Sequence, residues 1–190
     1  KQELIYKFNF DDSKSSLKKG TISGICECLE GVLVVYTDGT VCCISGEQQR
    51  ILWYNDVVAK NSTQEDEYQI SCDDEGNVWI YGDAHAYFYE KATGQWHRSI
   101  SELARAWGCN VSVNDDLVTG VACDKAGNMW LSTDRHGLFL LNASERNIKA
   151  HLMADVERGL SSNNLNTVYV DDTDLLWVGT SHAGVNYYAP

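Results

Sequence analysis

Residues 124–131 read DKAGNMWL, and this stretch decides the fold because the chain repeats it. Residues 73–80 read DDEGNVWI, and residues 171–178 read DDTDLLWV. The tryptophans of the three copies, Trp79, Trp130 and Trp177, are 51 and 47 residues apart. A period near this length, built from short apolar runs and tight turns, predicts an all-β fold, a β-propeller or part of one.

Each copy predicts a four-stranded antiparallel sheet, which is one blade of a propeller. An apolar strand precedes the aspartate, the Asp-x-x-Gly segment forms a turn, and the tryptophan lies on the next strand. We expect about four blades, at residues 20–55, 67–98, 118–152 and 166–190, with Val34 at the tryptophan position of the first and Ala86 matching Gly137. The recurring types predict a scaffold role for Asp73, Trp79, Asp124, Trp130, Thr133, Gly137, Asp171, Trp177, Thr180 and Gly184.

The two ends of the chain leave one alternative open. Residues 4–10 alternate apolar and polar side chains and predict an extra strand, whereas the last copy stops after its third strand. The first strand could complete the last sheet and close a ring of four blades, which removes exposed sheet edges. The chain could instead be a slice of a larger propeller.

Composition and charge exclude several classes of protein. The chain has 190 residues, 44% of them hydrophobic, and a net charge of −12. A nucleic-acid binder needs a basic surface, so that class is disfavoured, as is contact with an anionic membrane. The sequence contains no apolar run of the roughly 20 residues that span a bilayer.

Seven cysteines suggest a metal site or disulfides, but their positions favour a packing role, as small apolar residues on buried strands. Cys72 and Cys123 precede the repeated aspartate, and the third copy has Val170 there. Cys26 is expected at the same position in the first copy. Because no second cysteine pair has zinc-like spacing, we expect no metal and no cofactor.

One segment departs from the strand pattern. In residues 99–108, Ile100, Leu103 and Trp107 have helical spacing, Ser99 or Ser101 can cap the start, and Gly108 can end the helix. A short amphipathic helix between two blades is predicted.

The repeated pattern, Asp-x-x-Gly-x-x-Trp followed by Thr and Gly, resembles the two-component regulator propeller repeat. The best copy runs from Asp171 to Tyr188, and the resemblance covers residues 20–190. Such repeats form the periplasmic sensor region of bacterial hybrid histidine kinases, usually in larger rings, so we favour the slice over the closed ring. The first copy lacks the tryptophan, and Gly76 and Gly127 become Asp174.

The resemblance implies a non-enzymatic, periplasmic sensor portion whose ligand is an oligosaccharide, with the kinase module outside this chain. A protein-interaction scaffold and a propeller glycosidase or lyase are the alternatives. The expected partners are a small glycan or another small molecule, and a second copy in a homodimer, with no nucleic acid and no direct membrane contact. No nucleophile elbow or phosphate-binding loop supports catalysis.

Candidate ligand residues lie where the copies differ, because repeated residues build the scaffold. Aromatic rings can stack on sugars, and arginine can bind their hydroxyl groups. His85 and His136 follow their tryptophans at the same distance, and His182 comes one residue earlier. The predicted ligand-binding residues are Trp107, Arg135, His136, His85, His182 and Trp53.

Overall fold

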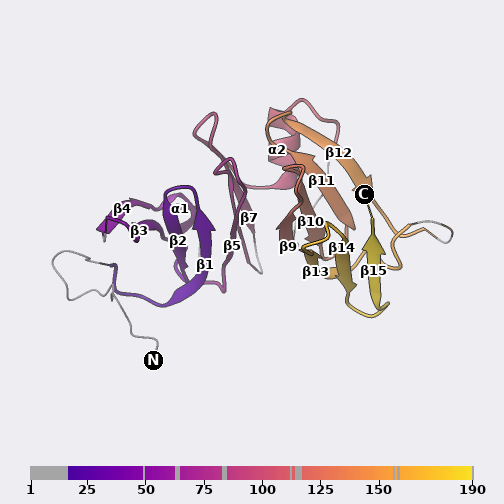
Figure 1. The fold of residues 1–190 in the computed structure, drawn as a ribbon, viewed down its shortest axis with the longest axis horizontal. Coiled ribbons are helices and arrows are strands. Elements are labelled where there is room, and N and C mark those ends of the chain that lie inside the picture. Colours follow the sequence, from indigo (N-terminus) through magenta and orange to yellow (C-terminus); the bar gives the residue numbers. More distant parts are fainter. Residues whose placement is uncertain are drawn as a thin grey trace. The chain divides into compact units, whose positions relative to one another are not determined.

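The computed structural model describes residues 17–189, except 49, 63, 64, 83, 84, 112, 114–116, 156 and 158. It contains antiparallel β-sheets and two short helices (Figure 1), which confirms the predicted all-β class with propeller-like blades. The chain divides into two compact units, residues 1–70 and residues 71–190. The strand predicted at residues 4–10 lies outside the described residues.

The first sheet has the strand order β1-β2-β3-β4. Its strands are β1 (Ile22–Cys28), β2 (Gly31–Tyr36), β3 (Val41–Ser45) and β4 (Arg50–Asn55), followed by a helix that the sequence did not predict, α1 (Val57–Asn61). Gly39, in the β2–β3 turn, has φ +81°, and a Cβ atom there would lie 2.8 Å from the Ala59 backbone nitrogen. The turn therefore requires glycine both for its conformation and for its contact with α1.

The second, third and fourth sheets repeat this up-and-down order. The second sheet consists of β5 (Gln69–Cys72), β6 (Val78–Tyr81), β7 (Ala86–Glu90) and β8 (Gln95–His97). The third consists of β9 (Val118–Cys123), β10 (Met129–Thr133), β11 (Leu138–Asn142) and β12 (Asn147–Leu152). The fourth has three described strands, β13 (Leu165–Val170), β14 (Leu176–Thr180) and β15 (Val185–Tyr188).

The repeated aspartate holds the turn between the first two strands of a sheet. Asp124 Oδ1 accepts hydrogen bonds from the backbone nitrogens of Ala126 (3.0 Å) and Asn128 (2.9 Å). Its Oδ2 accepts from the Trp130 indole nitrogen at 3.1 Å. One carboxylate thus satisfies the turn and the donor of the tryptophan that packs beside it.

The fourth sheet repeats this arrangement and the second sheet changes it. Asp171 Oδ2 accepts from the Trp177 indole nitrogen at 2.8 Å. Asp73 Oδ2 instead accepts from the Asn77 side chain at 2.8 Å, and the Trp79 indole nitrogen has no hydrogen-bond partner in the described part of the chain.

The register of the first sheet corrects the predicted tryptophan position. Trp130 pairs with Leu140, three residues after the glycine that closes its hairpin. In the first sheet, Leu33 pairs with Cys43, three residues after Thr40, which closes the hairpin in the same way. Leu33 therefore occupies the tryptophan position, and the prediction of Val34 was wrong by one residue.

The β6–β7 hairpin is one residue shorter than its counterpart in the third sheet. Phe88 is the strand partner of Trp79. His85, three residues before Phe88, therefore stands where Gly137 stands in the third sheet, and the predicted match of Ala86 to Gly137 was wrong.

Two apolar clusters lie between consecutive sheets of the second unit. The first joins the second sheet, the third sheet and α2 (Ile100–Ala106), and the other joins the third and fourth sheets. Trp130 belongs to the second cluster, with Leu165, Val168, Leu176 and Val178 of the fourth sheet. Removing apolar surface from water stabilises the fold by about 25 cal/mol per Å², which makes such contacts the main stabilising contribution.

The predicted helix is present as α2. The Ser99 hydroxyl accepts a hydrogen bond from the Glu102 backbone nitrogen at 3.0 Å, which is an N-cap. Gly108 has φ +72°, as expected of a residue that ends a helix. The buried residues Ile100, Leu103 and Ala104 form its inner face.

The repeated Thr and Gly close the next hairpin. The Thr133 hydroxyl donates to the Gly137 carbonyl oxygen at 2.7 Å and accepts from the His136 backbone nitrogen at 3.0 Å. Thr180 makes the same donation to Gly184 at 2.8 Å. Both glycines have positive φ, +69° and +80°, but only Gly137 is crowded, since a Cβ atom there would lie 2.2 Å from the Leu152 carbonyl oxygen.

Gly137→Ala and Gly184→Ala should therefore differ in cost although the two positions are equivalent. Gly184→Ala should lower the free energy of unfolding by roughly 1 to 2 kcal/mol, the cost of a left-handed alanine. Gly137→Ala should cost more than about 3 kcal/mol, because the backbone of β12 must also move. Urea denaturation of both variants checks this, and equal costs would contradict it.

Asp171 should titrate well below its repeat counterpart Asp73. Hydrogen bonds from the Trp177 indole and the Thr173 hydroxyl lower the pKa of Asp171 from 3.8 to about 2, whereas burial raises the pKa of Asp73. A depressed pKa means that the Asp171 carboxylate stabilises the fold above its ordinary pKa, and that this contribution is lost as pH falls through about 2. Titration of the carboxyl groups followed by NMR measures both pKa values, and Trp177→Phe should raise the pKa of Asp171.

Candidate functional site: a hollow between β8 and α2

A hollow of about 400 Å³ opens between β8 and α2 in the second unit. We call it the β8–α2 hollow, and its lining residues are Gln95, Trp96, His97, Glu102, Arg105 and Ala106. The lining combines an aromatic ring with amide, carboxylate, imidazole and guanidinium groups. This mixture suits a polar ligand that also has an apolar face.

The helix cap positions the polar side chains of α2 at the hollow. Glu102 Oε2 accepts a hydrogen bond from the Arg98 backbone nitrogen at 2.7 Å, while the Glu102 backbone donates to Ser99. Arg105 follows Glu102 by three residues, so both lie on the same side of the helix. Leu103 and Ala104 are buried, so the polar side of α2 is turned away from the core.

Trp96 supplies the aromatic surface of the hollow. Its ring is tilted by 40° against the ring of Tyr89, with centroids 5.1 Å apart. Trp96 is half-buried, and both Gln95 beside it and Arg105 across the hollow are exposed. A supported indole beside exposed amide and guanidinium groups can stack on one face of a ring and bind its substituents.

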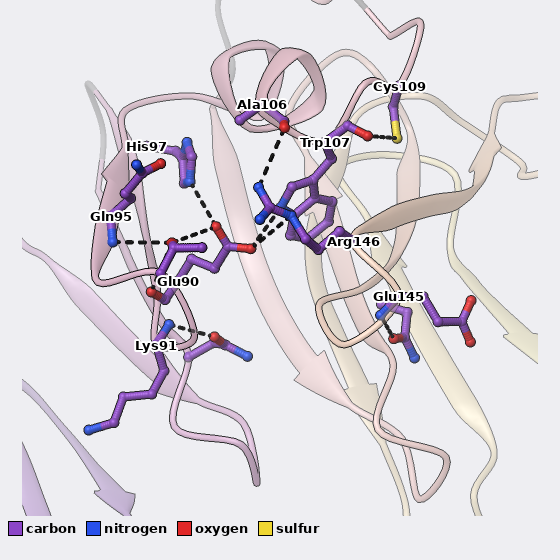
Figure 2. A network of polar contacts seen from close by, with 12 residues as sticks. Glu90, Lys91, Gln95, His97, Ala106, Trp107, Cys109, Glu145 and Arg146 are labelled. Atoms are coloured by element: carbon purple, nitrogen blue, oxygen red, sulfur yellow. Dashed lines mark hydrogen bonds and ion pairs between the residues drawn. The ribbon is translucent and has the colours of Figure 1, made fainter.

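A buried carboxylate lies next to the hollow. Glu90 is 1% exposed and accepts hydrogen bonds from the Thr93 hydroxyl (2.8 Å) and the Trp107 indole nitrogen (3.1 Å). Arg146 Nε of the third sheet lies 3.3 Å from Glu90 Oε1, and His97 Nε2 lies 3.5 Å from Oε2. Figure 2 shows His97, Trp107 and Arg146 directed at Glu90, from β8, the end of α2 and the β11–β12 turn.

This Glu90 network joins the hollow to the packing of two sheets. His97 lines the hollow and also faces Glu90. Arg146 donates from Nη2 to the Ala106 carbonyl oxygen at 3.4 Å, at the end of the helix that forms the other wall. Residues of both walls therefore contact the ion pair between the second and third sheets.

Two of the predicted ligand-binding residues are tryptophans in different surroundings. Trp107 donates to Glu90, meets the Phe88 ring edge-on at 5.9 Å and packs against the first apolar cluster. Trp53 belongs to the first sheet, where its indole nitrogen donates to Glu30 at 3.1 Å. Neither lines the β8–α2 hollow.

The other predicted ligand residues lie in the turns between the second and third strands of their sheets. Arg135 pairs with the neighbouring Asp134 (3.4 Å), and the carbonyl oxygen of His136 lies 2.6 Å from His151 Nε2. His85 and His182 are exposed. Because the β6–β7 hairpin is one residue shorter, His85 is not the counterpart of His136, contrary to the prediction.

Gln95, Glu102 and Arg105 were not predicted from the sequence. The helix at residues 99–108 was recognised, and the positions of Glu102 and Arg105 on its polar side could have identified them. The contact of β8 with this helix could not be read from the repeat, because the helical segment at residues 99–108 lies outside the repeated pattern.

The cysteines are free thiols among the residues that the structure describes, and no group of three His, Cys, Asp or Glu side chains there is arranged to hold a metal ion. Burial raises the pKa of Cys123 to about 12, which keeps it a thiol. Cys26 pairs with Leu33, as Ala122 pairs with Trp130, so its predicted match to Cys123 was wrong. No helix in the described ranges is both long and apolar enough to cross a membrane.

The sheet order and register are those of β-propeller blades, and solved structures with a similar fold agree with this assignment. No family model and no curated protein matches the sequence. The extracellular domain of the putative one component system BT4673 from B. thetaiotaomicron is similar over 96% of this chain and 23% of that chain, with 18% identity and a TM-score of 0.64. The extracellular domain of the putative hybrid two component system BT4673 from B. thetaiotaomicron is similar over 92% of this chain and 22% of that chain, with 18% identity and a TM-score of 0.62.

The β-propeller domain of Cps50 (Swd1) from Myceliophteria thermophila is also similar, over 89% of this chain and 54% of that chain, with 12% identity and a TM-score of 0.56. These likenesses confirm, at the level of fold, the expected resemblance to sensor regions of two-component systems. The chain spans less than a quarter of the length of the two BT4673 structures.

Arg146→Gln should destabilise the fold, because Glu90 would keep a buried charge without its counterion. We expect a loss of about 2 kcal/mol in the free energy of unfolding, below the full value for a buried pair since Arg146 is partly exposed. Adding Glu90→Gln should restore part of this loss. Urea denaturation of the double-mutant cycle measures the coupling, and Arg135→Gln, which breaks an exposed pair, is the control. If the losses in free energy of unfolding caused by Arg146→Gln and Glu90→Gln simply add in the double variant, the network is contradicted.

Proposed function

We propose that this chain is a ligand-sensing portion of the periplasmic region of a bacterial hybrid two-component sensor histidine kinase, and that its ligand is an oligosaccharide. The repeat resemblance and the fold shared with extracellular domains of two-component systems support the sensor role. The kinase module belongs to the parent protein in this proposal.

The observation that carries the choice of ligand is the β8–α2 hollow. Sugars present apolar ring faces that stack on indoles, and hydroxyl groups that bind amides and guanidinium groups. Trp96 offers the first kind of contact, and Gln95 and Arg105 offer the second.

Binding without turnover fits this lining better than catalysis. A glycosidase needs two carboxyl groups about 5 to 10 Å apart across the scissile bond. Among the residues that the structure describes, Glu102 is the one carboxylate that lines the hollow, and it accepts a hydrogen bond from the Arg98 backbone nitrogen at the start of α2. The propeller glycosidase or lyase therefore stays the weaker alternative.

A bound ligand can signal only by binding two arrangements of the sensor with different affinity. The Glu90 network gives the hollow a physical connection to the packing between two sheets, through His97 and Arg146. We propose that ligand binding shifts the position of α2 and that this shift acts on the ion pair.

Arg105→Gln should weaken oligosaccharide binding about tenfold or more, because a charged hydrogen-bond donor is lost. A panel of neutral and acidic oligosaccharides is screened first on an array, and hits are measured by calorimetry. Arg135→Gln, an exposed arginine outside the hollow, is the matched control and should bind like the unaltered chain.

Three results would contradict the proposal: no oligosaccharide of the panel binds, Arg135→Gln weakens binding and Arg105→Gln does not, or new reducing ends appear during incubation. The second result would move the site to the β10–β11 turn. The third would favour the glycosidase.

A further inference from the structure

The negative charge that lines the β8–α2 hollow already has a cationic partner within the protein. This charge belongs to Glu102, at the start of α2. Its Oε2 atom accepts a hydrogen bond from the Arg98 backbone nitrogen at 2.7 Å and lies 3.6 Å from Arg98 Nε. The Glu102 carboxylate therefore does not need a cation from a ligand.

The buried carboxylate beside the hollow is matched as well. Glu90 Oε1 lies 3.3 Å from Arg146 Nε, and the carboxylate also accepts hydrogen bonds from Thr93 and Trp107. Glu90 is 1% exposed, so a ligand in the hollow cannot reach it. Its charge is compensated inside the protein, by a residue of the third sheet.

Arg105 differs from both of these groups. It lines the hollow and is exposed there. Its guanidinium group makes no hydrogen bond or ion pair with any residue that the structure describes. Glu102 cancels Arg98 and Glu90 cancels Arg146, so the charge that is left at the hollow is that of Arg105, with histidine counted as neutral.

The net charge of the whole chain has the opposite sign, but it acts at longer range. The chain carries −12. At an ionic strength of about 0.1 M, charges more than about 10 Å apart are largely screened from each other. A ligand inside the hollow therefore interacts mainly with the groups that line it, and among these the unmatched charge is positive.

We propose, on the basis of the oligosaccharide-binding role proposed above, that the ligand of the hollow is an acidic oligosaccharide whose anionic group binds Arg105. A sugar ring that stacks on Trp96 directs the substituents at its edge sideways, toward the wall that α2 forms. A guanidinium group binds a carboxylate through two parallel hydrogen bonds, which adds direction to charge. A sulfate ester offers the same charge and similar acceptor oxygens.

A panel of matched oligosaccharides tests the charge of the ligand. Each sugar, of gluco or galacto configuration, is supplied as the uronic acid, the neutral hexose and the sulfate ester, and calorimetry measures the Kd. The unaltered chain should bind at least one acidic form about tenfold or more tightly than its neutral form, because hydrogen bonds between charged groups are stronger. Whether the uronic acid or the sulfate ester binds more tightly identifies the anionic group.

Arg105→Gln should reduce the ratio of acidic to neutral affinity to about one. Glu102→Gln keeps an acceptor for the Arg98 backbone but frees the Arg98 side chain, so this ratio should rise. Trp96→Ala should weaken both forms alike, because stacking on the indole does not require a charge on the sugar. Circular dichroism confirms the fold of each variant.

The possible results separate this proposal from the one on which it rests. Equal affinity of the unaltered chain for acidic and neutral forms would overturn the acidic ligand and leave the oligosaccharide proposal standing. A preference for acidic forms that Arg105→Gln retains would overturn the role of Arg105. If no member of the panel binds, the oligosaccharide proposal fails, and the acidic ligand fails with it.

Discussion

The turn aspartate supplies a hydrogen-bond acceptor for the indole nitrogen of the repeated tryptophan in the third and fourth sheets. Asp124 serves Trp130 and Asp171 serves Trp177, while the same carboxylates hold the backbone of the turn. The turn and the inter-sheet packing therefore depend on one side chain. Blade geometry follows, because the strand before the aspartate and the strand after the turn are fixed together.

The second sheet shows what the constraint allows. Asp73 keeps its bonds to the turn, but Trp79 lies in the apolar cluster without that partner among the described residues. Packing against Phe88, with ring centroids 4.8 Å apart, holds Trp79 in its place. Apolar contacts can thus hold a buried indole when the turn aspartate accepts from another side chain, although the indole nitrogen is then left without a hydrogen bond.

The sequence predicted the fold where a landmark residue was present. Trp79, Trp130 and Trp177 located three sheets, and Ser99 and Gly108 located the helix. In the first sheet residues 32–35 are all aliphatic, so nothing distinguished Leu33 from Val34, and the register failed by one residue.

The candidate site was predicted less well, because its parts are not repeated. Trp107 was expected to face a ligand, and its indole instead donates to Glu90, 17 residues away in sequence. Arg146 also reaches Glu90, from another sheet. Periodicity within a copy carries no information about such contacts between copies.

The turn at residues 171–174 of the fourth sheet makes a contact through a side chain that the other two copies do not have. Asp174 has φ +70° at a position that is glycine in the other two copies, and aspartate is one of the few residues that tolerate this. Its carboxylate accepts a hydrogen bond from the Lys125 backbone nitrogen at 3.0 Å. Replacing the fourth sheet with a copy of the repeat that has glycine at this position would remove the contact, because glycine has no carboxylate.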